Sequence, residues 1–570
     1  MMTLWDGPFL PLAALIWPLL LGGLVALPVL RARALAVLPL APLPALWLAL
    51  SGMPVEVTRA DDLLFGVVLG LEARGAAMPG MIAGLWLAAG IHAQGYMRAP
   101  RDAAVFAGFW CLTLAGNLGV VLARDLVTFY VAFAAVSLAA YFLVVHEHTD
   151  RALRAGRVYI VLAVLGEAAL LVAFTIGAAA ADSLLIADMR AALPEAPLGA
   201  LAIGLLVAGF GLKAGLIPLH VWLPLAHPAA PTPASAVLSG AIVKAGIVGL
   251  VLFVPPQIPV LATGLIWAGL ASAFLGAALG LTQSGAKAVL AYSTISQMGV
   301  VIAVIGAGLA GAGQIEAALH YAVHHGLAKG ALFLGVAVIG ATGRRNLTPV
   351  LIVTGLVALS VAGAPLTGGA LVKAAAKPGF GAAGALALTL SAVMTTLILL
   401  RFMLLVAPAH AESAQMRADW RMLVPWLAVS AAALALPWIN WSGWSGPLPT
   451  DYVLRPAQLW EAAWPVLLAL ALAAVAVRRR WRAPAVPEGD IVVPMEAAVQ
   501  RTISTLQRLP QIAPASSAER PVPDILPPPR TLLQRLAAWF EHAEAVLTRG
   551  RVVGIALLAV ALLVALLAGP

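Results

Sequence analysis

Charged residues, cysteine and lysine are all scarce in this sequence of 570 residues. Only 10% of the residues are charged and 62% are AVILMFWYC, so there are too few polar side chains to cover several soluble domains. The single cysteine, Cys111, excludes a disulfide framework, a cysteine-ligated zinc site and an iron–sulfur cluster. The composition therefore predicts an all-α polytopic membrane protein.

Apolar runs of about 18–25 residues recur along the chain, and each is long enough to cross a bilayer core of roughly 30 Å as a helix. The first begins near Phe9 without a basic region or a clear cleavage site before it, so we expect a retained span. We expect about sixteen spans in total, near 9–30, 33–51, 79–97, 103–122, 125–146, 158–180, 198–218, 234–254, 258–281, 293–311, 317–341, 347–376, 380–408, 421–440, 457–477 and 551–568.

The net charge of +9 is carried largely by arginines in short connectors between the apolar runs. If the N-terminus lies outside, the odd-numbered connectors hold sixteen Lys and Arg residues and the even-numbered connectors hold six. This bias predicts a multi-pass protein of a bacterial-type inner (plasma) membrane with its N-terminus outside. The lipid bilayer, and no nucleic acid, is then the partner of the basic residues.

Only six of the 34 Lys and Arg residues are lysine, all six lie between 213 and 377, and no arginine occurs from 191 to 343. Lysine, unlike arginine, can lose its proton when it is desolvated. Four of the lysines lie inside expected spans, where each costs roughly 2.5–3.5 kcal/mol at a helix centre: Lys213, Lys244, Lys329 and Lys373.

Only Glu195 and Glu316 are acidic between 191 and 343, so these lysines cannot all form buried ion pairs. They must be neutral part of the time, or hydrated, and both conditions suit a proton path. The alternative is that a lysine extends to the membrane interface. We favour that alternative for Lys287, which lies in a connector, and for Lys377, which lies near the end of a span.

Histidines accompany the lysines in ALHYAVHHGLAKGALF, residues 318–333. His325 and Lys329 are four residues apart and share one helical face, and His320 and His324 share a neighbouring face. Imidazole titrates near neutrality and can relay protons between lysines. A metal site and hydrogen-bonded core histidines are the alternatives, but no carboxylate or cysteine completes a metal site here. We predict no metal and no cofactor.

Two segments have the pattern of interrupted helices. The segment 211–233 contains five prolines downstream of Lys213, and the segment 363–378 contains Pro365, Gly368 and Gly369 just before Lys373. Paired broken segments beside ionisable residues indicate an inverted-repeat transporter.

With these motifs the chain resembles the antiporter-like subunits of respiratory complex I, and more closely the related subunits of Mrp-type cation/proton antiporters and membrane-bound hydrogenases. The matching stretches are GLKAGLIPLHVWLPLAHPAAPTPASAVLSGAIVKAG (211–246), AKAVLAYSTISQMGVV (286–301), HHGLAKGALF (324–333) and GAPLTGGALVK (363–373). The resemblance implies a core of about fourteen helices with two inverted five-helix repeats, each containing one broken helix.

We therefore expect five parts of the chain. They are N-terminal helices (1–99), an antiporter-like proton-translocation core (100–408), C-terminal helices (409–482), a cytoplasmic segment rich in proline with amphipathic pieces near 494–508 and 530–548 (483–549), and a final membrane anchor (550–570).

The resemblance also assigns roles to residues. Lys213 matches the lysine of the first broken helix, and Lys244 that of the following helix. His325 and Lys329 match the central relay pair, and Lys373 the ionisable residue of the second broken helix. The family normally has a glutamate in a pattern like F-E-x-x-S-L, but here the aligned residue is Ala134, within FAAVSL (133–138).

Glu167, in the next helix, is our hypothesis for a substitute partner of Lys213, and a helix-packing glutamate with a local partner is the alternative. The expected function is a proton- or cation/proton-translocating subunit that works with other membrane subunits. Whether Na⁺ or K⁺ is countertransported stays open. Two rival functions stay open as well: a non-conducting scaffold subunit, and an energy-coupling subunit for inorganic-carbon uptake. We expect no redox catalysis by this chain itself; any oxidoreductase activity would belong to the assembly.

Overall fold

The structure is a computed structural model of the whole chain. It describes residues 9–25, 27–51, 55–60, 65–71, 77–97, 102–312, 315–409, 412, 414–439, 441, 448–449, 451–481, 484, 486–494 and 557–559. The two amphipathic pieces expected near 494–508 and 530–548 fall almost entirely outside these residues, as does most of the final anchor.

The described part of the chain is predominantly helical. The N-terminal elements are α1 (Phe9–Leu24), α2 (Pro28–Arg31), α3 (Ala34–Val37), α4 (Leu43–Leu50), β1 (Val55–Ala60), β2 (Val67–Leu71) and α5 (Ala77–Tyr96). The next group is α6 (Ala103–Leu122), α7 (Leu126–Val144), α8 (Asp150–Ala181), α9 (Ile186–Ala192), α10 (Gly199–Ala214), α11 (Trp222–Ala229), α12 (Thr232–Val237) and α13 (Lys244–Phe253). The last group is α14 (Pro259–Leu281), α15 (Ala286–Ala307), α16 (Ile315–Gly340), α17 (Leu347–Ala362), α18 (Gly368–Ala376), α19 (Ala382–Val406), α20 (Trp420–Ile439) and α22 (Pro456–Arg478).

Among the described residues, eleven helices are long and apolar enough to cross a membrane. The chain is an integral multi-pass membrane protein, and the expected all-α class is confirmed. Several spans lie close to their expected limits, such as α6 at Ala103–Leu122 and α14 at Pro259–Leu281.

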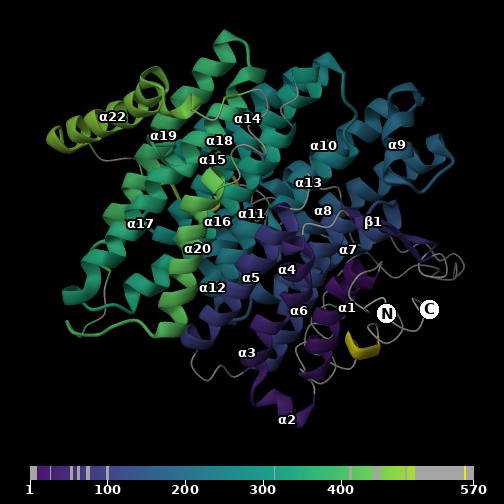
Figure 1. Cartoon of the computed structure of the whole chain (residues 1–570), viewed down its shortest axis with the longest axis horizontal. Helices are drawn as coiled ribbons and strands as arrows, with labels where there is room; N and C mark the ends of the chain where they lie inside the picture. Colours follow the sequence, from purple (N-terminus) through teal and green to yellow (C-terminus); the bar gives the residue numbers. More distant parts are fainter. Residues whose placement is uncertain are drawn as a thin grey trace, which may run out of the picture.

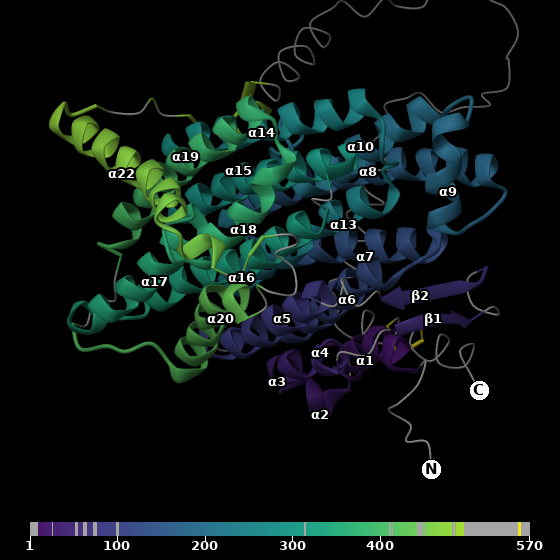
Figure 2. The same cartoon turned by 45° about the horizontal axis from the view of Figure 1, so that its top comes forward.

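The helices form a wide array in which α15 and α16 occupy the middle, while α9 and α22 lie at opposite edges (Figure 1; Figure 2). The most apolar stretch of α15 is entirely buried, whereas 17% of the most apolar stretch of α22 is buried. Side chains on the central helices are thus shielded from lipid by protein.

A β-hairpin is the element that the sequence analysis did not anticipate. Strands β1 and β2 pair in antiparallel fashion, with Ala60 opposite Val67, and β2 contacts α6 and α7 (Figure 2). The hairpin is fixed to the start of α7 because the Val68 amide donates to the Asp125 carboxylate, N to Oδ2 2.8 Å. The other oxygen of Asp125 accepts from the Thr128 amide and caps α7, so one side chain holds both elements.

Both expected breaks are present, and each begins at a glycine in the left-handed conformation. Gly215 (φ +81°) ends α10 and Gly363 (φ +83°) ends α17. In both places the amides of the glycine and of the next residue bond carbonyls of the last helical turn, the Schellman arrangement that lets a chain leave a helix sharply. The same C-terminal cap therefore ends the helix before the break in both broken segments.

Alternation of the helices places the connectors 145–149, 230–231, 282–285, 341–346 and the described residues 407–409 and 414–419 at one face, which we call the basic face. A backbone bond from the Gly343 amide to the Met416 carbonyl joins two of these connectors. At the opposite face, the Gln257 amide bonds the Leu309 carbonyl. Basic residues gather in or beside the connectors of the basic face: Arg151, Arg154, Arg157, Lys287, Arg344, Arg345 and Arg417.

Candidate functional site

Lys213 lies in the last turn of α10, directly before the first break, and is 3% exposed. Its ammonium donates to the Ser137 hydroxyl on α7, Nζ to Oγ 2.8 Å. It also lies over the rings of Phe133 and Tyr159, 5.4 and 5.8 Å from their centroids, which favours a cation. The Leu212 carbonyl beside it accepts from both the Gly215 amide, at 3.1 Å, and the Trp222 indole, at 2.9 Å.

Glu167 reaches the same place from α8 and is 7% exposed. Its carboxylate lies near Ser137, and its charge attracts Lys213. Its Oε1 has no hydrogen-bond partner among the described residues. The structure thus brings together the pair that the sequence suggested, although Ala134 leaves α7 without a carboxylate there.

Lys244 lies at the centre, directly after a π-helical turn, Leu238–Ile242, that joins α12 to α13. The Ser239 carbonyl of this turn accepts from the Lys244 ammonium at 2.6 Å. The same ammonium contacts Nδ1 of His325 on α16 at 2.8 Å. Both side chains are 1% exposed, so one proton between Lys244 and His325 is held away from water and lipid.

Lys329 is fully buried one turn further along α16, and its ammonium donates to the Leu290 carbonyl of α15 at 3.1 Å. Its charge repels that of Lys244. The sequence placed His325 and Lys329 on one face as a pair, whereas the hydrogen bond of His325 goes to Lys244 across the helix interface.

Lys373 lies in α18, beyond the second break, and its ammonium donates to the Ala362 carbonyl at the end of α17, at 2.6 Å. This carbonyl is one that the break leaves without a helical partner. A cavity of about 50 Å³ touches Lys373 and extends to Lys377 and Glu461, large enough for a few waters.

His320 and His324 have different hydrogen-bond partners. His324 bonds the Ser360 hydroxyl, Nε2 to Oγ 2.9 Å, and that hydroxyl accepts from the Gly369 amide at the start of α18. Nδ1 of His320 bonds the Glu316 carbonyl one turn earlier, at 2.9 Å. The part of the chain that the structure describes contains no group of three or more His, Cys, Asp or Glu side chains placed to hold a metal ion.

The two lysines that we interpreted as interface anchors both have protein partners. Lys377 pairs with the Glu461 carboxylate of α22. Lys287 lies in the first turn of α15, rather than in a connector, and donates to the Ala230 carbonyl at 2.6 Å. The prediction that Lys287 lies in a connector is therefore wrong, and its ammonium joins α15 to the end of the first broken segment.

Helix α15 carries several polar groups that sequence reasoning missed. Thr294 bonds Ser239 beside Lys244, at 2.7 Å between hydroxyls, and Gln297 bonds Thr395 and Tyr321, at 2.9 Å each. Tyr292 donates to a carboxylate of the C-terminal segment, described below. The polar residues of AYSTISQ (291–297) inside an apolar span were the sequence feature that could have identified them.

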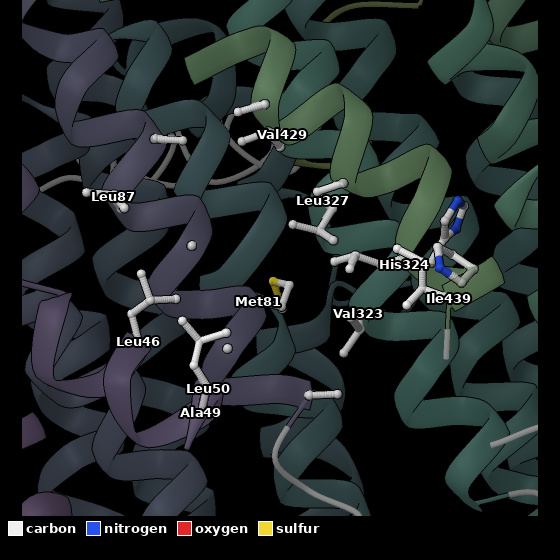
Figure 3. A pocket seen from close by; sticks show the side chains of 18 of the residues that line it. Leu46, Ala49, Leu50, Met81, Leu87, Val323, His324, Leu327, Val429 and Ile439 are labelled. Atoms are coloured by element: carbon white, nitrogen blue, oxygen red, sulfur yellow. The ribbon is translucent and has the colours of Figure 1, made fainter. Parts of the chain in front are cut away.

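A larger cavity of about 890 Å³ opens beside these polar side chains, between α4, α5, α16 and α20. Figure 3 shows its apolar lining, with Leu46, Leu50 and Met81 on one side and Val429 and Ile439 on the other, and His324 at its edge. The cavity thus reaches the buried polar side chains at His324.

Comparisons with known proteins identify the segment of the chain that contains these residues. Residues 123–399 match the family model described as NADH:quinone oxidoreductase/Mrp antiporter, transmembrane region. This segment is antiporter-like. It contains both broken helices and every lysine of the chain.

Curated relatives match over similar lengths. Hydrogenase-4 component B of Escherichia coli is 30% identical over 290 residues, 48% of this chain and 43% of the relative. NADH-quinone oxidoreductase subunit N of Desulforudis audaxviator is 29% identical over 55% of this chain and 62% of its own length. Na⁺/H⁺ antiporter subunit A1 of Staphylococcus haemolyticus is 30% identical over 51% of this chain and 40% of its own length. The chain spans about half the length of these relatives.

Solved structures show the same fold. A chain of the Mrp complex from a Dietzia species superposes with a TM-score of 0.68 at 21% identity, covering 83% of this chain and 100% of that one. A chain of an archaeal membrane-bound sulfane sulfur reductase, a respiratory membrane complex, gives 0.66 at 18% identity, covering 81% and 99%. The expected resemblance and antiporter-like fold are confirmed.

Proposed function

We propose that this chain is a proton-translocating membrane subunit of a larger assembly of the complex I, Mrp or hydrogenase type. The observation that carries the proposal is a row of four buried lysines between two broken helices: Lys213, Lys244, Lys329 and Lys373. Each donates to an oxygen or nitrogen of the core. So many buried amines raise the free energy of insertion, which indicates a role other than stability.

Lys213 is the proposed entry store. Glu167, Ser137 and two aromatic rings favour its charged form, whereas its burial favours the neutral form. These effects act in opposite directions on the gain and loss of a proton at Lys213. A store of this kind can exchange its proton when a neighbouring charge changes.

Lys244 and His325 are the proposed lateral relay. A single proton lies between Nζ and Nδ1, 2.8 Å apart, so it can move without large movement of either side chain. Lys329 repels a charge on Lys244. Arrival of a proton at one of the two lysines therefore promotes its loss from the other.

Lys373 is the proposed exchange residue for the opposite face. It touches the small cavity that leads to the Lys377–Glu461 pair, and waters in this cavity would connect it to that face. The break at Gly363 supplies the carbonyl that holds Lys373 at the cavity wall.

The test is proton flux through the chain, purified with its native partners and reconstituted in liposomes with a pH-sensitive dye. We expect Lys213→Ala and Lys373→Ala to abolish flux. Lys287→Met is the matched control, because this lysine is bonded to Ala230 outside the row and should leave flux intact. No flux in the wild-type assembly would instead support a non-conducting scaffold subunit. Flux that survives both alanine variants would exclude the lysine row.

A further inference from the structure

The C-terminal segment 486–494 returns to the core at the basic face, although it follows the last described span. The Val486 carbonyl accepts from the Gln283 side chain at 3.2 Å, and Glu488 pairs with Arg151 of α8 at 2.6 Å. Gly489 has φ +85°, and a Cβ there would lie 3.0 Å from Leu225 of α11. The backbone of this segment is thus seated closely against α11.

Asp490, the next residue, inserts its carboxylate into the core and is 8% exposed. Its Oδ2 accepts from Nε2 of His220 and from the Tyr292 hydroxyl, both at 2.8 Å. Its Oδ1 accepts from the amide of Ile491. A buried carboxylate with this many donors is held in its charged form.

His220 lies in the break of the first broken helix, between Gly215 and the start of α11, and is fully buried. Its Nε2 is occupied by Asp490, but Nδ1 has no hydrogen-bond partner among the described residues. A buried ring nitrogen without a partner is costly unless it exchanges a proton or binds water. Lys213, the proposed entry store, lies seven residues earlier in the same broken helix.

We propose that His220 and Asp490 form a proton-loading site at the basic-face end of the first broken helix, completed only when the segment 486–494 is docked. This inference rests on the proposed function. His220 takes up one proton at Nδ1 to become an imidazolium, which the Asp490 carboxylate stabilises, and loss of that proton inward restores the neutral ring. The C-terminal segment thereby supplies a carboxylate to a core that lacks one at Ala134.

Other titratable groups around the pair are few. Tyr292 approaches from α15, Glu488 belongs to the docked segment, and Arg151 approaches from α8, where it is paired with Glu488. Lys287 lies in the first turn of α15, and its ammonium donates to the Ala230 carbonyl. The Asp490 carboxylate is thus the anion in direct contact with His220.

The test uses the whole assembly in liposomes, with proton flux and hydrogen exchange of the 486–494 amides measured in parallel. Asp490→Asn keeps the shape and an acceptor oxygen for Tyr292 but removes the charge, so we expect the 486–494 amides to stay protected with a modest loss, and the flux to fall by about 100-fold, the scale of a lost proton-transfer group. His220→Gln should have the same effect, and the double variant should be no worse than either single one.

Two further variants separate docking from chemistry. Gly489→Leu would meet Leu225 and strain a positive φ, so we expect loss of both amide protection and flux although Asp490 is still present. Glu488→Gln removes a pair whose side chains are 57% and 29% exposed, so we expect little change in either measurement.

The outcomes distinguish the two proposals. Wild-type flux that Asp490→Asn and His220→Gln both leave unchanged would overturn the loading site alone. Absence of flux in the wild type, or flux indifferent to Lys213→Ala and Lys373→Ala, would overturn the proposed function and the loading site with it.

Discussion

Glu167→Gln is the variant that examines the entry site most directly, because it removes the charge that attracts Lys213 and preserves the shape of the side chain. Hydrogen bonds and contacts that involve a charged group contribute about 1.5–3 kcal/mol. If Glu167 favours the charged form of Lys213 by this amount, its loss corresponds to about a 10- to 100-fold lower rate of proton loading, at 1.36 kcal/mol for each factor of ten.

Proton flux in liposomes measures this loss, and Glu195→Gln is the control, since Glu195 is exposed at the end of a short helical turn. Ala134→Glu in the Glu167→Gln background restores a carboxylate on α7, one turn from Ser137, and should recover part of the flux. Unchanged flux in Glu167→Gln would refute the reasoning and make Glu167 a packing residue.

Three further predictions concern stability and pH. Gly363→Ala places a Cβ 2.7 Å from the Lys373 side chain at φ +83°, so we expect it to lower the free energy of unfolding by about 1–2 kcal/mol in thermal denaturation; Gly381→Ala, with no neighbour within 4 Å, should be silent. Lys244→Met removes a buried amine, so the melting temperature should hold or rise while flux is lost; a lower melting temperature would show that the Ser239 and His325 contacts are needed for folding. Burial raises the pKa of Asp490, but bonds from His220, the Ile491 amide and Tyr292 outweigh it and keep that pKa below 3.8. Docking of 486–494 should therefore be stable above pH 3.8 and weaken as the pH falls through the lowered value, as proteolysis of the segment across pH would reveal.

The sequence was sufficient to find the buried lysines, because lysine and arginine are segregated and membrane insertion makes a buried amine costly. Their burial at Lys213, Lys244, Lys329 and Lys373 is observed, whereas their roles stay predictions. The breaks were also expected, but they were predicted mainly from the prolines. The residues that end the helices, Gly215 and Gly363, were not identified. A glycine after an apolar helical run was the available signal.

Contacts between distant segments were beyond the sequence. Asp490 and His220 are 270 residues apart, and no local periodicity relates them. Lys287 was misplaced because α15 begins earlier than hydropathy alone suggests, at Ala286. The β-hairpin was missed because its strands are short and lie between apolar helices.

One consequence follows from the position of α15. This single rigid element contacts Lys329 through Leu290, the Lys244 neighbourhood through Thr294, Asp490 through Tyr292 and α16 through Gln297. A shift of α15 along its axis would alter all of these contacts at once. Under the proposed function, a partner subunit that pushes on either end of α15 would synchronise loading and lateral transfer mechanically, without touching any of the titratable side chains.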